Sequence, residues 1–189
     1  MTRAAAETID NRDRFLQAVE QGAIVIGASL FVALCAKITV PLTPVPLTVQ
    51  NFAVILVGLM LGGRRGFAAL VLYLAEGASG LPVFTPGPGG IAQLLGPTGG
   101  FLLAFPFVAG LAGWLFERGK FTFAWAAISG LLAEVLLFAF GVSWLYTFTH
   151  SFATAFRVGF VVFIFAEVIK IMVAAGTATS WRRVFKQRA

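Results

Sequence analysis

Residues 161–175 read VVFIFAEVIKIMVAA, an apolar run that carries one acid and one base. With its flanking residues the run is long enough to cross a bilayer as a helix. Glu167 and Lys170 are three residues apart, so a helix places both on one face. A charge near the centre of a membrane helix costs about 2.5 to 3.5 kcal/mol on insertion scales, so the pair should face the protein interior. This placement favours a functional pair, and a self-contained structural ion pair is the alternative.

The composition of the 189-residue chain indicates an all-α integral membrane protein. Hydrophobic residues make up 59% and charged residues 12%, with a mean hydropathy of +0.90, which is more apolar than a soluble domain of this size requires. No flexible linker or charged insert interrupts the chain, so we expect residues 1–189 to form a single transmembrane domain. The basic residues are not clustered with aromatic ones on a solvated face, so we expect no nucleic-acid partner.

Apolar runs separated by charged or Gly- and Pro-rich turns predict six transmembrane helices. Three prolines within residues 41–46 end the first helix, and a long Gly- and Pro-rich connection at 81–98 separates the third from the fourth. A short polar helix is expected ahead of the first span. The six spans are predicted at residues 22–39, 48–62, 67–80, 99–116, 121–142 and 156–177.

The positions of the basic residues predict how the chain is oriented. Of the 14 Lys and Arg residues, eleven lie in the two terminal tails and in the turns at 64–65 and 117–120. With six spans all four segments lie on one side, and by the positive-inside rule that side is the cytoplasm. We therefore expect a multi-pass protein of the cell (plasma) membrane with both termini cytoplasmic and with loop 40–47 facing outward.

Polar side chains within the predicted spans gather in the outer half of the membrane. This distribution favours a ligand pocket that opens outward and is capped by loop 40–47, and it argues against an open channel. Of these residues, Glu134 is more simply explained as one that bonds within the bundle. The polar residues concerned are Lys37, Gln50, Asn51, Glu76, Glu134 and Glu167.

Several candidate site residues have both a functional and a structural interpretation. Gln50 and Asn51 follow the proline-rich loop, where their amides offer donors and acceptors to a ligand or cap the first turn of the second span. Glu76 precedes a small-residue patch that either a ligand or a packed helix can approach closely. Trp144 and Tyr146 either stack on a flat ligand or belong to the aromatic belt at the membrane interface.

Motifs of the common enzyme and metal sites are absent from the sequence. His150 lies beside Ser151 without a Gly-x-Ser-x-Gly motif or a second histidine. One Cys and one His do not make a usual zinc site, and no Gly-x-x-x-x-Gly-Lys-Ser/Thr phosphate loop occurs. We expect no enzyme activity, no catalytic residues, no metal and no cofactor.

The sequence resembles the BioY family, the biotin-specific S components of energy-coupling factor (ECF) transporters. Each shared segment is modest alone, but their order and spacing together are specific. The segments are ITVP at 38–41, PVPLTVQ at 44–50, LVG at 56–58, LG at 61–62, GLPVF at 80–84 and GPTGGF at 96–101. The resemblance implies a six-helix subunit that captures biotin from outside and delivers it inward with an ECF transmembrane coupling subunit and two ATPase subunits.

The resemblance also implies roles for individual residues. Loop 40–47 matches the segment that closes over the ligand. Glu167 and Lys170 match an acid and a lysine that contact the bicyclic head of biotin, with Glu167 in place of the aspartate that many members carry. The other substrate-binding candidates are Gln50, which matches a ligand-binding glutamine, and Glu76, Trp144 and Tyr146.

Partner docking is implied by the first span. Ser29 and Ala33 have the small-xxx-small spacing of closely packed membrane helices. In the BioY family this face of the first helix docks onto the coupling subunit, and here Ser29 replaces the usual alanine.

The chemistry of the acid and the base agrees with biotin as the ligand. The planar ureido group offers two N–H donors and one carbonyl acceptor, which suit Glu167 and Lys170 respectively. Two other functions stay open, namely an S component for another vitamin and a self-sufficient secondary transporter. A secondary transporter should show an internal repeat, and the sequence has no convincing one.

Overall fold

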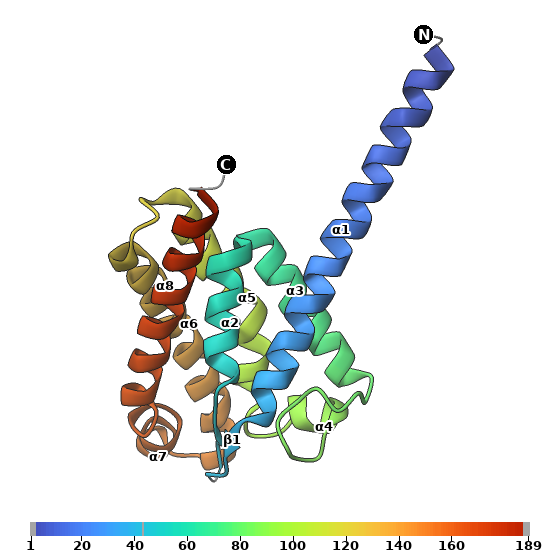
Figure 1. Ribbon diagram of the computed structural model, residues 1–189. Helices are drawn as coiled ribbons and strands as arrows, with labels where there is room; N and C mark the ends of the chain where they lie inside the picture. The colour runs from blue at the N-terminus through green and yellow to red at the C-terminus, as the bar shows by residue number, and fades with distance from the viewer. Residues whose placement is uncertain (1–2, 43, 187–189) are drawn as a thin grey trace.

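The computed structural model describes residues 3–42 and 44–186, which form mainly helices (Figure 1). The predicted helical fold class is therefore confirmed. In chain order the elements are α1 (Arg3–Lys37), β1 (Thr39–Val40), β2 (Leu47–Thr48), α2 (Gln50–Leu61), α3 (Gly63–Ala78), α4 (Gly90–Leu94), α5 (Gly99–Arg118), α6 (Phe123–Thr149), α7 (Phe152–Phe156), the π-helix η1 (Arg157–Val161) and α8 (Ile164–Lys186).

Helix α1 is continuous over 35 residues, which differs from the sequence prediction of a separate polar helix ahead of the first span. The reason is local, because residues 3–21 contain neither proline nor glycine and nothing breaks the helix there. In Figure 1 this helix extends well beyond the rest of the bundle.

In the described part of the chain, four helical segments are long and apolar enough to cross a membrane, namely Asp13–Lys37, Gly99–Arg118, Phe123–Thr149 and Phe152–Val184. Helix α2 has only 12 residues, which at 1.5 Å per residue gives about 18 Å, short of a hydrocarbon core of about 30 Å. The predicted six spans thus stay a prediction where α2 and α3 are concerned.

Helices α2 and α3 are joined by a single residue, Gly62, whose φ of +84° favours glycine. The predicted spans 48–62 and 67–80 leave a turn at 63–66, but Gly63 already begins α3, so these residues are helical. Helix α2 lies close against α5, since a Cβ on Gly58 would clash with the backbone carbonyl of Ala109. This small-residue contact places α2 inside the bundle, with most of its residues buried.

The last predicted span, 156–177, consists of three helical pieces rather than one. Helix α7 begins after Ser151, whose side chain accepts a hydrogen bond from the Thr154 N–H. The π-helix η1 follows and α8 begins at Ile164. π-helical turns interrupt regular helices and are frequent at functional sites. Gly159 in η1 and Phe163 just after it are both buried.

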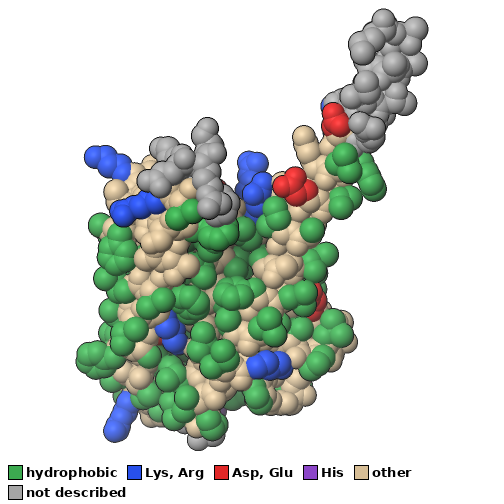
Figure 2. All heavy atoms as spheres, in the orientation of Figure 1, with side chains coloured by type: hydrophobic (Ala, Val, Ile, Leu, Met, Phe, Trp, Pro, Cys, Tyr) green, Lys and Arg blue, Asp and Glu red, His purple; other side chains and the backbone are tan. Residues whose placement is uncertain are grey.

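The β1–β2 hairpin and the short helices α4 and α7 lie at one end of the bundle (Figure 1). Strands β1 and β2 pair antiparallel, with Thr39 opposite Thr48, and they lie at the same end as α4 and α7, away from the last turns of α8 (Figure 1). Figure 2 shows hydrophobic side chains covering the sides of the bundle, while Lys and Arg side chains gather near the end of α8. This distribution is typical of a helical membrane protein.

Candidate functional site

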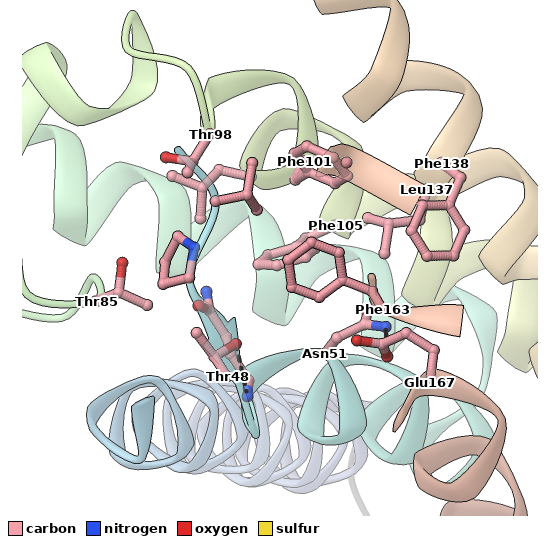
Figure 3. A pocket seen from close by; sticks show the side chains of 15 residues that line it. Thr48, Asn51, Thr85, Thr98, Phe101, Phe105, Leu137, Phe138, Phe163 and Glu167 are labelled. Atoms are coloured by element: carbon pink, nitrogen blue, oxygen red, sulfur yellow. Dashed lines mark hydrogen bonds between the residues drawn. The ribbon is translucent and has the colours of Figure 1, made fainter. Parts of the chain in front are cut away.

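A cavity of about 70 Å³ lies inside the bundle near the hairpin (Figure 3). Val45 and Pro46 from the proline-rich loop line one side of it. Its apolar walls include four phenylalanines, which come from α5, α6 and the turn before α8. These are Phe101, Phe105, Phe138 and Phe163. The cavity thus combines an apolar interior with loop residues at its border.

The polar edge of the cavity is a chain of hydrogen bonds between α2, α6 and α8. Asn51 and Glu134 are each 5% exposed and Glu167 is 6% exposed. The Asn51 Nδ2 group donates to Glu167 Oε2 at 2.7 Å and to Glu134 Oε1 and Oε2 at 3.0 and 2.9 Å. Glu167 Oε1 lies 2.7 Å from Lys170 Nζ. One amide therefore joins two buried carboxylates, and one of these is paired with a lysine.

Glu167 and Lys170 lie on one face of α8, as the spacing predicts, but only one of them borders the cavity. Glu167 lines it, whereas Lys170 is not among its lining residues. The lysine side chain is 15% exposed and the glutamate side chain 8%. The two charges form an ion pair without a ligand. The alternative of a self-contained structural ion pair therefore describes part of what is seen. Glu167 is nevertheless the charged group that the cavity presents.

Gln50 also lines the cavity. Its Nε2 group donates to the Tyr73 hydroxyl at 2.8 Å, and that hydroxyl donates to the Val83 carbonyl at 3.1 Å. The cap of α2 is Val49 and has no side-chain capping bond. The alternative role of Gln50 and Asn51 as helix caps is therefore not the one that their side chains adopt.

Three other predicted ligand contacts lie outside this cavity. Glu76 accepts a hydrogen bond from the Ser29 hydroxyl, which ties α3 to α1. The Trp144 indole N–H donates to the Gly96 carbonyl at 2.9 Å, so it holds the loop that leads to α5. Tyr146 is 48% exposed on the bundle surface. None of the three lines the cavity.

The predicted docking residues on α1 face the bundle rather than its surroundings. Ser29 is 0% exposed and Ala33 8% exposed, and Ser29 is bonded to Glu76. Ser29 thus packs α1 against Glu76 of α3, and docking of a partner through Ser29 and Ala33 stays a prediction. Leu30, Phe31 and Leu34 are the exposed side chains of this stretch.

Sequence reasoning did not single out the phenylalanines that wall the cavity, and it missed the link from Asn51 to Glu134. Phe101 and Phe105 are four residues apart on α5 and hence on one helix face. With 20 phenylalanines in the chain, this spacing alone does not single them out. Asn51 and Glu134 are 83 positions apart, and only the tertiary fold reveals their contact.

Together the fold and the site define a helical membrane protein with a small internal cavity, apolar inside and carboxylate-bearing at one edge. The family model described as "BioY family" matches residues 6–187. The chain belongs to the BioY family.

Named relatives cover most of the chain. The biotin transporter BioY of Thermotoga maritima is 40% identical over 166 residues, which are 86% of this chain and 98% of the relative. The biotin transporter BioY2 of Lactococcus lactis subsp. cremoris is 40% identical over 148 residues, 78% of this chain and 81% of the relative. These relatives are transporters and not enzymes.

A solved structure also has this fold. The crystal structure of the S-component for biotin from an ECF-type ABC transporter superposes with a TM-score of 0.81 at 26% identity. The match covers 88% of this chain and 93% of that chain.

Proposed function

We propose that the protein is a substrate-binding membrane subunit that captures biotin from outside the cell and delivers it inward with an ATP-driven ECF module. The observation that carries the proposal is Glu167 at the edge of a phenylalanine-walled cavity, held by Lys170 and Asn51. The ligand is suggested by the names of the relatives and of the solved S component.

The chemistry of biotin fits this cavity. Glu167 accepts from a ureido N–H, and Lys170, which is paired with Glu167 but does not line the closed cavity, donates to the ureido carbonyl once the cavity has opened, both as charge-assisted hydrogen bonds. The phenylalanine walls suit the fused sulfur ring and the aliphatic tail. Gln50, on the hairpin side of the cavity, is the proposed contact of the tail carboxylate, which accepts from its amide N–H.

Binding requires the loop to move. The cavity volume of about 70 Å³ is well below the roughly 300 to 1,000 Å³ of typical ligand pockets. Val45 and Pro46 are the lining residues that belong to loop 40–47. We propose that this loop opens to admit biotin and then closes over it.

The proposed topology has six crossings, with both termini in the cytoplasm and the hairpin outside the plasma membrane. The excess of Lys and Arg in the tails and in the turns at 64–65 and 117–120 supports it. Helices α2 and α3 are short, so we propose that each crosses with its ends covered by neighbouring helices and loops rather than by lipid.

The proposed partners are the ECF transmembrane coupling subunit and two ATPase subunits, since the chain has no phosphate loop of its own. ATP binding by the partners supplies the difference in biotin affinity between the outward and inward states. Leu30 and Leu34 are available for docking on α1 without rearrangement. Ser29 and Ala33 take part only if α1 shifts relative to α3.

Equilibrium binding tests the ligand. We expect the purified full chain in detergent to bind labelled biotin far more tightly than thiamin or riboflavin. Equal or tighter binding of another vitamin would reject biotin as the substrate. Uptake by cells with and without the partner subunits tests the coupling, because undiminished uptake without them would favour a self-sufficient transporter.

A further inference from the structure

We infer that Asn51 is a third group that binds the ureido head of the ligand, and that Glu134 is a positioning residue that aims it. The inference rests on the proposed binding of biotin and deepens it, because it assigns the second ureido N–H to a specific atom, Asn51 Oδ1. It starts from the hydrogen bonds of the Asn51 side chain.

The orientation of the Asn51 amide is fixed by two carboxylates. Its Nδ2 group has two hydrogens. One bond goes to Glu167 Oε2 at 2.7 Å, and the other is shared between both Glu134 oxygens at 3.0 and 2.9 Å. The reverse orientation would set the Asn51 carbonyl oxygen against carboxylate oxygens, where like partial charges repel. Nδ2 therefore points at the acids and Oδ1 points away from them.

Asn51 Oδ1 is the atom left to meet a ligand. It is buried, and no hydrogen-bond donor in residues 3–42 and 44–186 reaches it. Buried carbonyl oxygens nearly always accept a hydrogen bond. Asn51 also lines the cavity, together with Glu167 (Figure 3). The donor that Oδ1 lacks is thus expected to come from the molecule that occupies the cavity.

The ureido group supplies a matching set of atoms. It has one carbonyl acceptor and two N–H donors in one plane. In the proposed function Lys170 is the donor, and Glu167 and Asn51, which both line the cavity, supply the two acceptors. Each ureido atom then has one protein partner. Without Asn51, one of the two N–H groups would be buried without an acceptor or would have to share Glu167.

Glu134 acts through Asn51 and does not touch the ligand. It is buried on α6 but is not among the residues that line the central cavity. It lines a neighbouring groove between α6 and α8, which shares Glu167 and Phe138 with the cavity. Among the described residues, Asn51 Nδ2 is the only group that donates a hydrogen bond to its carboxylate. Removing that acceptor frees the amide to rotate, and Oδ1 loses its fixed direction.

The test combines variants with altered ligands. Isothermal titration calorimetry on the purified full chain would measure the Kd of biotin and of two analogues, each methylated on one ureido nitrogen. We expect Asn51→Ala to raise the Kd of biotin roughly tenfold. One of the two methylated analogues should bind the wild-type protein at least tenfold more weakly than biotin does, because its methyl group replaces the N–H that faces Asn51. In Asn51→Ala the same analogue should bind almost as well as biotin.

The positioning role of Glu134 is tested by the preference between biotin and the methylated analogue, which a loss of packing alone would not change. Glu134→Leu should reproduce the altered preference for the methylated analogue. Glu134→Gln retains an acceptor for Asn51 Nδ2 and should keep the biotin Kd within about threefold. Ser129→Ala is the matched control on α6, since within residues 3–42 and 44–186 the buried Ser129 hydroxyl bonds only to the Trp125 carbonyl of its own helix. It should leave the Kd unchanged.

The outcomes separate this inference from the proposed function. If Asn51→Ala binds biotin as tightly as the wild type does, the role of Asn51 is overturned but the proposed function is not. The same holds if both methylated analogues lose as much affinity for Asn51→Ala as for the wild-type protein. Equal effects of Glu134→Gln and Glu134→Leu would reduce Glu134 to a packing residue. A wild-type protein that binds no biotin would remove the proposed function and this inference together. If Asn51→Ala does not fold, Asn51→Leu, which keeps the branching at Cγ and also lacks the amide oxygen, takes its place.

Discussion

Glu167 Oε1 and Lys170 Nζ lie 2.7 Å apart on the inner face of α8. Both side chains are largely buried, so each charge is stabilised mainly by the opposite charge of its partner. The pair is held in place from α2, because Asn51 bonds the second Glu167 oxygen at 2.7 Å. A ligand that enters the cavity therefore meets a carboxylate whose direction is already fixed, which lowers the ordering cost of binding.

Lys170→Met keeps most of the length of the side chain but removes its charge. We expect the Kd of biotin to rise roughly 10- to 100-fold, because one charge-assisted hydrogen bond is lost. The free energy of unfolding should fall by about 3 kcal/mol, because Glu167 stays buried without its cation. Titration calorimetry and thermal unfolding in detergent measure the two effects. Lys120→Met, at an exposed turn, is the control. Reduced stability with an unchanged Kd would make the pair purely structural.

Tyr73→Phe tests the support behind Gln50. The Tyr73 hydroxyl accepts from Gln50 and donates to the Val83 carbonyl. Removing it leaves both groups without a partner, so we expect a loss of about 1 to 3 kcal/mol in the free energy of unfolding. Tyr146→Phe is the matched control, since Tyr146 is 48% exposed and Tyr73 0%, and its effect should stay within about 0.5 kcal/mol. Equal unfolding temperatures of the two variants would contradict the proposed support.

Glu76→Gln tests whether Glu76 binds the ligand, as the sequence suggested, or only joins α3 to α1 through Ser29. The amide oxygen of the substituted side chain would still accept a hydrogen bond from Ser29, and Glu76 does not line the cavity. We expect the Kd of biotin to change less than about twofold, whereas Glu167→Gln, which removes a charged acceptor, should raise it roughly tenfold or more. Titration calorimetry compares the two variants. A similar loss in both would place Glu76 in contact with the bound ligand.

The periodicity of a helix made part of the site predictable. Because residues three apart share one helix face, an acid and a base in an apolar run predict that Glu167 and Lys170 face inward together. Gln50 was predictable as a polar residue next to the prolines. The helical fold class follows from hydropathy alone.

Contacts between distant segments were not predictable in this way. Ser29 and Glu76 are 47 positions apart, and each was assigned a separate role because nothing in the local sequence pairs them. The one-residue junction at Gly62 and the π-helix η1 depend on how neighbouring helices pack, which hydropathy does not encode. Trp144 fits an aromatic belt by composition, yet its indole N–H bonds the Gly96 carbonyl.

Membrane topology is testable through cysteine labelling, because Cys35 is the single native cysteine and is buried. In a Cys35→Ala background, Leu42→Cys lies in the proline-rich loop and Lys120→Cys in the α5–α6 turn, both at exposed positions. With six crossings and cytoplasmic termini, a membrane-impermeant maleimide should label position 42 in intact cells and position 120 only after permeabilisation. The Cys35→Ala protein without an added cysteine gives the background. Labelling of position 120 in intact cells, or of position 42 only after permeabilisation, would mean that α2 and α3 do not cross as proposed or that the chain is inverted.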